Sequence, residues 1–299
     1  MQRLRSMISD SESDSDDEYI MRRPRWIKER SEHFLNYDDK DFKIRFRLSK
    51  AAAYDLLLKI EDKLEFLSER NQSISPTNQL LATLRFYATN NTQLTIGDFS
   101  GLSVSTAHRI IHRRKRLELS YVQTICNANM EITDIVARWP GSRHDSTIFN
   151  NCSRKAKFEA GDYGQAILLV DGGYASTSYT LPPLENPRTP AEQLYNESQI
   201  RTRNPVERSY GVWKRRFPAL AIGLRVKLDK ALTIIIATAV LHNISRQRGE
   251  PVPPDDPELV LAAPWDELLR SGQMERISNR PYRNRVRDLL ISNYFQNLS

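Results

Sequence analysis

Three acidic residues at the ends of predicted elements have the side-chain type needed for metal-ion chemistry. Asp145 precedes a predicted helix, and Asp171 directly follows the apolar run Ile167–Val170. Glu207 lies near the start of a helix predicted from Pro205. Hard divalent cations stabilise charge on a reacting phosphorus, activate water and prefer carboxylate ligands. Acids from separate elements that meet at the end of a sheet can hold two such ions about 4 Å apart, so the pattern predicts a metal-dependent site that cleaves phosphodiester bonds.

Each acid also has a purely structural interpretation. Asp145 could cap the helix that follows it, and Asp171 could shape the glycine turn that follows it. Glu207 could close a capping box at the start of its helix. Taken singly, these structural roles are the simpler interpretation. The three acids together, in a basic chain, favour metal ligation.

The helix predicted to begin at Pro205, with Asn204 as its cap, has an apolar face and a basic face. Its apolar residues recur at spacings of 4, 3 and 4, which favours a stripe against a core: Val206, Tyr210, Trp213 and Phe217. Its basic residues surround Glu207, and we expect them along a phosphate backbone: Arg208, Lys214, Arg215 and Arg216.

The charge of the chain favours a polyanionic partner. The net charge is +7, and residues 1–20 hold two arginines against six acids, so the remainder carries +11. Such a positive field is typical of proteins that bind nucleic acid, although a soluble basic enzyme is the alternative. Two cysteines argue against a disulfide framework or a cysteine-rich zinc site. We find no signal peptide, and the apolar run Ala231–Leu241 is too short to span a bilayer, so no membrane partner is expected.

The composition divides the chain into four predicted segments. Residues 1–30 form a disordered acidic and basic tail, 31–116 a helical domain, 117–247 a catalytic domain, and 248–299 a linker and C-terminal tail. In the helical domain, Pro76 opens a helix.

A helix-turn-helix is predicted downstream in that domain. Its parts are a short helix at Thr95–Phe99, a turn at Gly101–Ser103 and a second helix at Val104–Arg114. The alternative is a helical hairpin with a solvated basic face. In a DNA complex, we expect four residues at the reading end: Ser103, Ser105, Thr106 and Arg109. We expect the basic residues that follow near phosphates: His112, Arg113, Arg114, Lys115 and Arg116.

The second half of the chain predicts an α/β layer. Tyr121–Cys126 and Ile132–Val136 have the pattern of a hairpin joined at Asn127–Asn129. Ala166–Val170 is typical of a strand covered on both faces. Leu228–Arg246 predicts a helix in which His242 is a satisfied buried residue. We find no P-loop, no GxGxxG motif and no zinc spacing among the histidines.

Several motifs together resemble the PIF/Harbinger transposases, in particular the Harbinger transposase-derived nucleases of animals. They are TICNANMEITDIVARWPGSRHDSTIFNNC, LLVDGGY, TPAEQLYNESQIRTRNPVERSYGVWKRRFPAL and AVLHNI, within residues 40–247. The resemblance implies an RNase H-like fold and a DDE-type site with two Mg²⁺ or Mn²⁺ ions held by Asp145, Asp171 and Glu207. It also implies DNA binding by the upstream helix-turn-helix and a Myb-like partner protein. The two cysteines are expected to be reduced thiols, which favours the nucleus and also the cytoplasm.

One departure from the family affects the expected activity. In the family, a strand with the pattern Gly-x-Ile-Asp-x-Thr-His follows the basic helix and supplies the first catalytic aspartate. Here Arg116 runs almost directly into the strand predicted from Tyr121, and Glu118 and Asp134 are poor replacements. The central first strand is therefore expected to be missing, and loss of one metal ligand predicts a large fall in turnover.

Two functions follow. The first is a metal-dependent DNA endonuclease, impaired by loss of the first aspartate. The second is a domesticated DNA-binding or partner-binding protein without catalysis.

Overall fold

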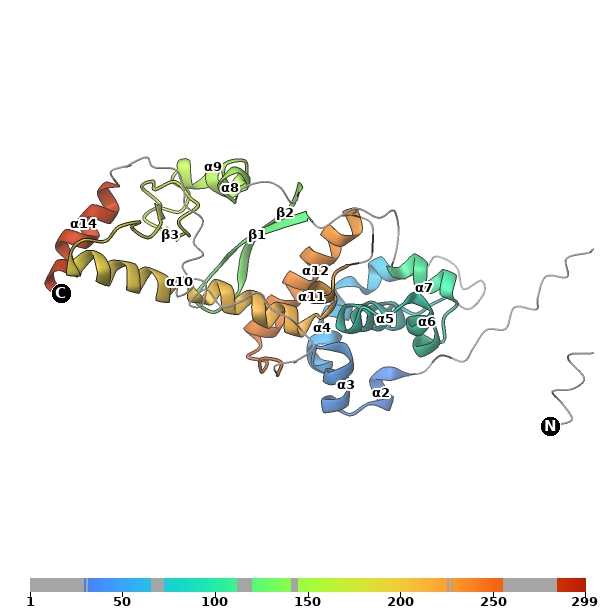
Figure 1. Cartoon of the computed structure of the whole chain (residues 1–299). Helices are drawn as coiled ribbons and strands as arrows, with labels where there is room; N and C mark the ends of the chain where they lie inside the picture. Colours follow the sequence, from blue (N-terminus) through green and yellow to red (C-terminus); the bar gives the residue numbers. More distant parts are fainter. Residues whose placement is uncertain are drawn as a thin grey trace, which may run out of the picture.

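The computed structural model describes residues 30, 32–65, 73–111, 120–140, 145–224, 226, 228–254 and 284–299. These residues form a mixed α/β structure that is mostly helical (Figure 1). The long helix α10 (Pro190–Arg216) packs against both pairs of strands and against several other helices. It connects the C-terminal end of the molecule with the centre, and the N-terminal helices gather on the other side (Figure 1).

The N-terminal half consists of helices. They are α2 (His33–Asn36), α3 (Asp39–Phe46), α4 (Lys50–Leu64), α5 (Pro76–Thr89), α6 (Gln93–Ser100) and α7 (Val104–Ile111). The predicted start of α5 is confirmed, because Ser75 caps it and Pro76 occupies its first position, where no N–H is needed. The apolar side chains predicted for this helix are buried: Leu80, Leu81, Leu84, Phe86 and Tyr87.

A close approach of backbone holds α6 to the turn before α7. The Leu102 N–H donates to the Gly97 carbonyl oxygen at 2.8 Å, and a Cβ at Gly97 would lie only 2.8 Å from the Leu102 carbonyl oxygen. Gly101 ends α6 with a φ of 63°, a conformation that glycine adopts without steric cost. The predicted pair of helices joined by a tight turn is present as far as Ile111. Residues 112–116 lie outside the described residues.

The strands form two separate pairs in the described part of the chain. β1 (Ser120–Cys126) pairs with β2 (Ile132–Pro140) antiparallel, which confirms the predicted hairpin. β3 (Leu168–Leu169) pairs with β4 (Thr180–Leu181) parallel. The prediction of a five-residue strand covered on both faces is wrong, because only Leu168 and Leu169 pair and Ile167 is 41% exposed.

The expectation that the acids meet at one end of a single sheet is also wrong, because the described strands form two separate sheets. No backbone ladder joins β1 to β3 among the described residues, and a side-chain hydrogen bond connects the two regions instead: Gln123 Nε2 donates to the Tyr174 hydroxyl at 2.6 Å. The predicted lack of a central first strand stays a prediction.

Helix α10 begins 15 residues earlier than predicted. It starts at Pro190, where Thr189 and Glu192 form a capping box, and it continues through Pro205. An internal proline removes one helical hydrogen bond, but side chains buried on both sides of it hold the two halves in place: Tyr195, Gln199, Val212 and Trp213. Asn204 is therefore not a cap. The predicted apolar stripe is confirmed, with Trp213 and Phe217 buried.

One buried cluster includes residues from both predicted domains. Phe42, Phe46 and Leu84 of the helical half belong to the same cluster as Ile132, Trp213, Phe217 and Ile234. The short helix α11 (Ala219–Ile222) packs against α5 and α10. The division at residue 116 stays a prediction.

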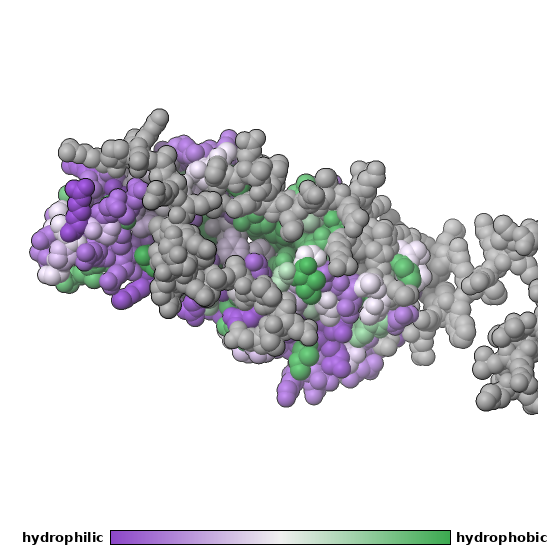
Figure 2. All heavy atoms as spheres, in the orientation of Figure 1, coloured by the Kyte–Doolittle hydropathy of each residue, from purple (hydrophilic) through white to green (hydrophobic). Residues whose placement is uncertain are grey.

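Helix α12 (Leu228–Gln247) contributes to this core. Among the described helices it is the one long and apolar enough, by length and composition, to cross a membrane. Its side chains pack instead as in a core helix, with Ile234, Ile235 and His242 buried. Ile236 and Val240 stay exposed, and Figure 2 shows apolar surface in this middle part of the molecule.

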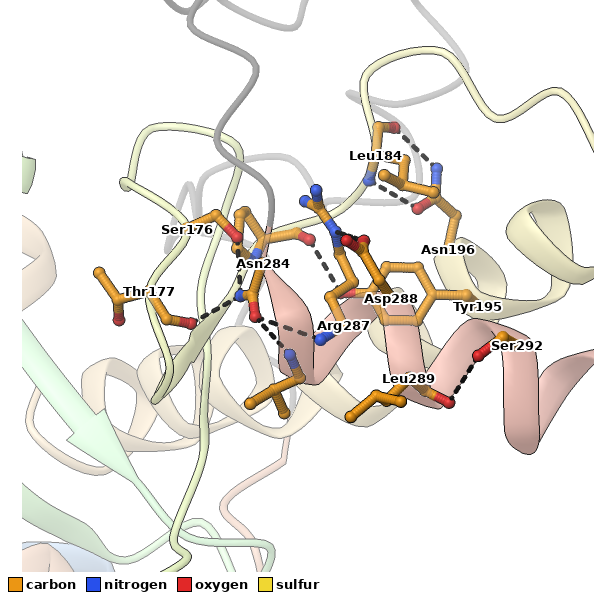
Figure 3. A network of polar contacts seen from close by, with 12 residues as sticks. Ser176, Thr177, Leu184, Tyr195, Asn196, Asn284, Arg287, Asp288, Leu289 and Ser292 are labelled. Carbon is orange, nitrogen blue, oxygen red and sulfur yellow. Dashed lines mark hydrogen bonds and ion pairs between the residues drawn. The ribbon is translucent and has the colours of Figure 1, made fainter.

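Residues 284–299 were predicted to be part of a C-terminal tail. In the structure they pack on the fold instead. Helix α14 (Arg285–Asn293) and the 3-10 turn η1 (Phe295–Asn297) lie against α10. The buried amide of Asn284 donates to the Ser176 hydroxyl at 2.8 Å and to the Thr177 carbonyl at 2.6 Å (Figure 3). This network connects α14 to the loop that follows Asp171.

Candidate active site

Arg203 lies between two of the three predicted acids. Its guanidinium is 4.0 Å from Asp171 Oδ2 and 3.7 Å from Glu207 Oε1. The Arg203 side chain is 11% exposed, against 26% for Asp171 and 38% for Glu207. The carboxylates are therefore partly open to solvent while the cation that they share lies beneath them.

Helix α10 places three side chains along the end of β3. Gln199, Arg203 and Glu207 are spaced by four residues and so share one face of the helix. Gln199 Nε2 donates to the Val170 carbonyl at 2.7 Å and to the Leu181 carbonyl at 3.1 Å, within a buried environment. These bonds fix Val170, the residue between β3 and Asp171, so the position of that carboxylate depends on α10.

Asp171 has the structural role considered for it, and its second carboxylate oxygen faces Arg203. Its Oδ1 accepts a hydrogen bond from the Gly173 N–H at 2.8 Å, which shapes the glycine turn as expected for an Asx turn. Its Oδ2 faces Arg203. The structural role therefore leaves one carboxylate oxygen directed at the cation.

Glu207 lies in the interior of α10, so its capping-box interpretation is wrong. The capping box of this helix is formed by Thr189 and Glu192, at the true start. The charge of Glu207 also affects the pKa of Cys126, the last residue of β1. Burial, and then the negative charge of Glu207, raise the pKa of the Cys126 thiol to about 11. The thiol is therefore neutral at pH 7, the form in which a cysteine is less nucleophilic.

Asp145 is the first residue of α8 (Asp145–Asn150), and its side chain lies outside the described part of the structure. α8 and the following helix α9 (Ser153–Glu159) pack together. Phe149 of α8 contacts Tyr174 edge to face, with ring centroids 5.8 Å apart. Since Tyr174 follows Asp171 by three residues, this contact packs the helix of Asp145 against the Asp171 loop.

The predicted nucleic-acid contacts divide into three groups. Arg208 is exposed, and Lys214 and Arg215 are half-buried on the same helix. The side chains of Arg109, Arg113, Arg114 and Lys115 lie outside the described residues. The expectation that Arg216 lies along a phosphate backbone is wrong. Its side chain is 1% exposed and pairs with Glu250 at 3.2 Å. Its guanidinium also donates to the carbonyls of Arg47 and Pro251, so it stabilises the core and does not face a phosphate.

The two described acids fit part of a divalent metal site. Two carboxylates that converge on one cation have the donor chemistry that Mg²⁺ and Mn²⁺ prefer. Among the described side chains, no group of three acidic, histidine or cysteine residues is placed to hold a metal. The third predicted ligand, Asp145, falls outside that set.

Sequence reasoning missed Gln199 and Arg203. Arg203 and Gln199 precede Glu207 by four and eight residues, but only in a helix that continues through Pro205 do the three residues share a face. The helix start predicted at Pro205 hid this relationship.

Comparison with known proteins identifies the domain around these residues. Residues 108–243 match the family described as DDE superfamily endonuclease. This match covers 136 of the 299 residues of the chain. All three predicted acids fall within the matched residues of this DDE domain.

Relatives of the DDE domain include proteins named Putative nuclease HARBI1. Those of Bos taurus and Homo sapiens are each 25% identical over 246 residues, covering 61% of this chain and 70% of the relative. The Rattus norvegicus protein is 25% identical over 295 residues, covering 76% and 82%. The chain is therefore homologous to the Harbinger transposase-derived proteins at modest identity. No solved structure matches it significantly.

The alignments contain positions for which this chain has no residue. Coverage of 61% of 299 residues is about 182 residues, which leaves about 64 of the 246 positions aligned with the bovine protein unmatched here. For the rat protein, 76% is about 227 residues and leaves about 68 of 295 positions. The expectation that a strand is missing after Arg116 stays a prediction.

Proposed function

We propose that this protein descends from a Harbinger-type transposase and acts as a divalent-metal-dependent endonuclease on DNA. The observation that carries the proposal is the convergence of Asp171 and Glu207 on Arg203, 4.0 and 3.7 Å away. The DDE domain and the name of its mammalian relatives support it. An RNase H-like ancestry for the domain is part of the proposal.

The proposed site uses the carboxylates of Asp145, Asp171 and Glu207 to hold Mg²⁺ or Mn²⁺. When bound, such ions neutralise charge on the phosphate and activate water. Asp171 is held for this role by the Gly173 N–H and by the fixed end of β3. Arg208, Lys214 and Arg215, on the same helix as Glu207, bind the phosphate backbone.

Substrate binding in this proposal also uses the helix pair α6–α7 as a helix-turn-helix. Ser103 and Ser105 are exposed at the start of α7, and the Ser103 hydroxyl accepts from the Thr106 N–H at 3.2 Å, which caps the helix. Arg109 and the basic residues Arg113, Arg114 and Lys115 would then follow the groove. We further propose a nuclear location and a Myb-like partner protein.

Cleavage of supercoiled plasmid in Mg²⁺ or Mn²⁺ tests the proposed activity. We expect the full chain to nick the plasmid and Glu207→Gln to lose at least about 100-fold in rate, because an acidic ligand is replaced by a neutral amide. Glu197→Gln is the matched control, since Glu197 is an exposed acid on the same helix, paired with Arg201. Equal cleavage by all three proteins would remove Glu207 from the reaction.

A second function, DNA binding without catalysis, is favoured by the missing positions. The chain lacks about 64 positions of the bovine alignment, and β1 and β3 are not joined in one ladder among the described strands. This function predicts salt-sensitive DNA binding without metal-dependent nicking. Arg113→Ala with Arg114→Ala should weaken that binding and reduce its salt dependence by about two charges.

A further inference from the structure

We infer that Arg203 is the resident counter-cation of Asp171 and Glu207, and that a divalent ion entering this site must compete with it. The inference rests on the proposed function and concerns the regulation of the same site. It assigns a role to a residue that lies four positions before Glu207 on the same face of α10.

Charge balance is the first argument. Two carboxylates lie within ion-pair distance of one guanidinium, so the three groups together carry one net negative charge. The Arg203 side chain is more buried than either acid, and a buried guanidinium is costly without anions beside it. Arg203 and the two acids therefore stabilise one another in the protein without metal.

The distances are the second argument. Separations of 3.7 and 4.0 Å are those of ion pairs and exceed the 2.7–2.9 Å typical of a charge-assisted hydrogen bond. Arg203 therefore offsets part of the charge of the acids without the bidentate geometry that makes arginine–carboxylate pairs strong. Such a pair is open to exchange for a cation of higher charge.

Independent support of the two segments is the third argument. Gln199 connects α10 to the carbonyls of Val170 and Leu181, one helical turn away from Arg203. Asp171 is also held by the Gly173 N–H. The acids thus have anchors besides Arg203, and its replacement should change their electrostatics more than their positions.

The inference predicts opposite effects for neighbouring substitutions. Arg203→Gln removes a positive charge beside the two acids, so Mn²⁺ should bind more tightly. We expect its Kd to fall about tenfold, since one charge at this distance shifts ionisation equilibria by a factor of ten or more. Asp171→Asn and Glu207→Gln should weaken Mn²⁺ binding, and Arg203→Lys should stay close to the wild type.

The experiment is a Mn²⁺ titration of the full chain by calorimetry, with thermal unfolding in EDTA as a second measurement. Arg201→Gln is the control, because Arg201 is 80% exposed on the same helix and pairs with Glu197. Without metal, Arg203→Gln should lower the unfolding temperature, and adding Glu207→Gln should restore part of it by relieving repulsion between the acids.

The outcomes separate the two proposals. Equal or weaker Mn²⁺ binding by folded Arg203→Gln, with binding by the wild type intact, would overturn the role of Arg203 and leave the metal site standing. If neither wild type nor Arg203→Gln binds Mn²⁺, both the metal site and the competition at it are wrong.

Discussion

Asp171 and Glu207 are 36 residues apart in the chain and face the same guanidinium. Asp171 follows the short strand β3 by two residues, and Glu207 lies inside α10, so neither position follows from the other locally. Their common neighbour Arg203 and the bonds of Gln199 to the end of β3 explain why they meet. The predictions below test the contacts that support this arrangement.

Gln199→Ala should destabilise the protein and disturb the acid pair. It removes two hydrogen bonds and leaves the Val170 and Leu181 carbonyls without this donor in a buried environment, at a cost of about 2–3 kcal/mol. Urea unfolding measures the loss, and Mn²⁺ titration measures the disturbance of Asp171. Gln193→Ala, at an exposed position on the same helix, is the control. A Gln199 variant as stable as this control would show that α10 does not depend on the contact.

Asn284→Ala should loosen the loop after Asp171. The Asn284 side chain is buried, donates to Ser176 and Thr177, and accepts from the first N–H groups of α14 (Figure 3). Its loss removes a helix cap and the loop contacts together, about 2 kcal/mol. Hydrogen exchange should become faster at residues 176–180. Gln296→Ala, which is exposed, should leave exchange there unchanged, and the same slow exchange in both variants would contradict the prediction.

Acid should destabilise the protein through His242. This side chain is fully buried beside the Met130 carbonyl at 2.8 Å, as the sequence predicted, and burial lowers its pKa from 6.5 to about 4. The unfolded chain therefore takes up a proton below about pH 6.5 while the folded protein does so only near pH 4. Stability is full above pH 6.5 and falls by about 3 kcal/mol as the pH drops to 4.

Urea unfolding at several pH values checks this, with His242→Gln as the comparison. Glutamine can still donate to the Met130 carbonyl but does not titrate. His33 also has a lowered pKa from burial and adds loss in the same direction in both proteins. Identical pH dependence in wild type and variant would assign the acid sensitivity to other groups.

Arg216→Ala should lower the stability of the protein, and loss of the Arg216 charge should leave the salt dependence of DNA binding unchanged. Removing one member of a buried ion pair costs about 3–5 kcal/mol, and Lys43, 3.4 Å from Glu250, offsets only part of that loss. The pair also holds the start of α4, since Glu250 Oε1 accepts from the Ser49 N–H at 3.2 Å. A double variant, Arg216→Met with Glu250→Leu, should regain much of the loss.

The salt dependence of DNA binding distinguishes this structural role from a phosphate contact. If Arg216 contacted phosphate, the slope would fall by about one in the double variant. We expect the same slope as in the wild type, and a fall in Arg208→Ala.

Local rules predicted many elements correctly. Ser75 and Pro76 open α5, alternating residues form the β1–β2 hairpin, and the stripe ending at Trp213 and Phe217 faces the core. The same rules misplaced the start of α10, because proline is tolerated both at a first turn and, with enough packing, inside a helix.

The positive charge of Arg216 led to a wrong prediction of a surface position. Ser209, Val212, Trp213 and Arg216 are buried at helical spacing, so the pattern places residue 216 inside. Its partner Glu250, 34 residues away, is what makes burial of that charge possible.

By itself, the sequence determined the resemblance, the candidate acids, the basic character and most helices, because residue types and short periodicities act within a few residues along the chain. Only the tertiary structure decided that Arg203 bridges Asp171 and Glu207, that Gln199 holds the end of β3, and that Arg216 is internal. Those relationships depend on where α10 lies against β3 and the end of α12, which is set by packing between distant segments.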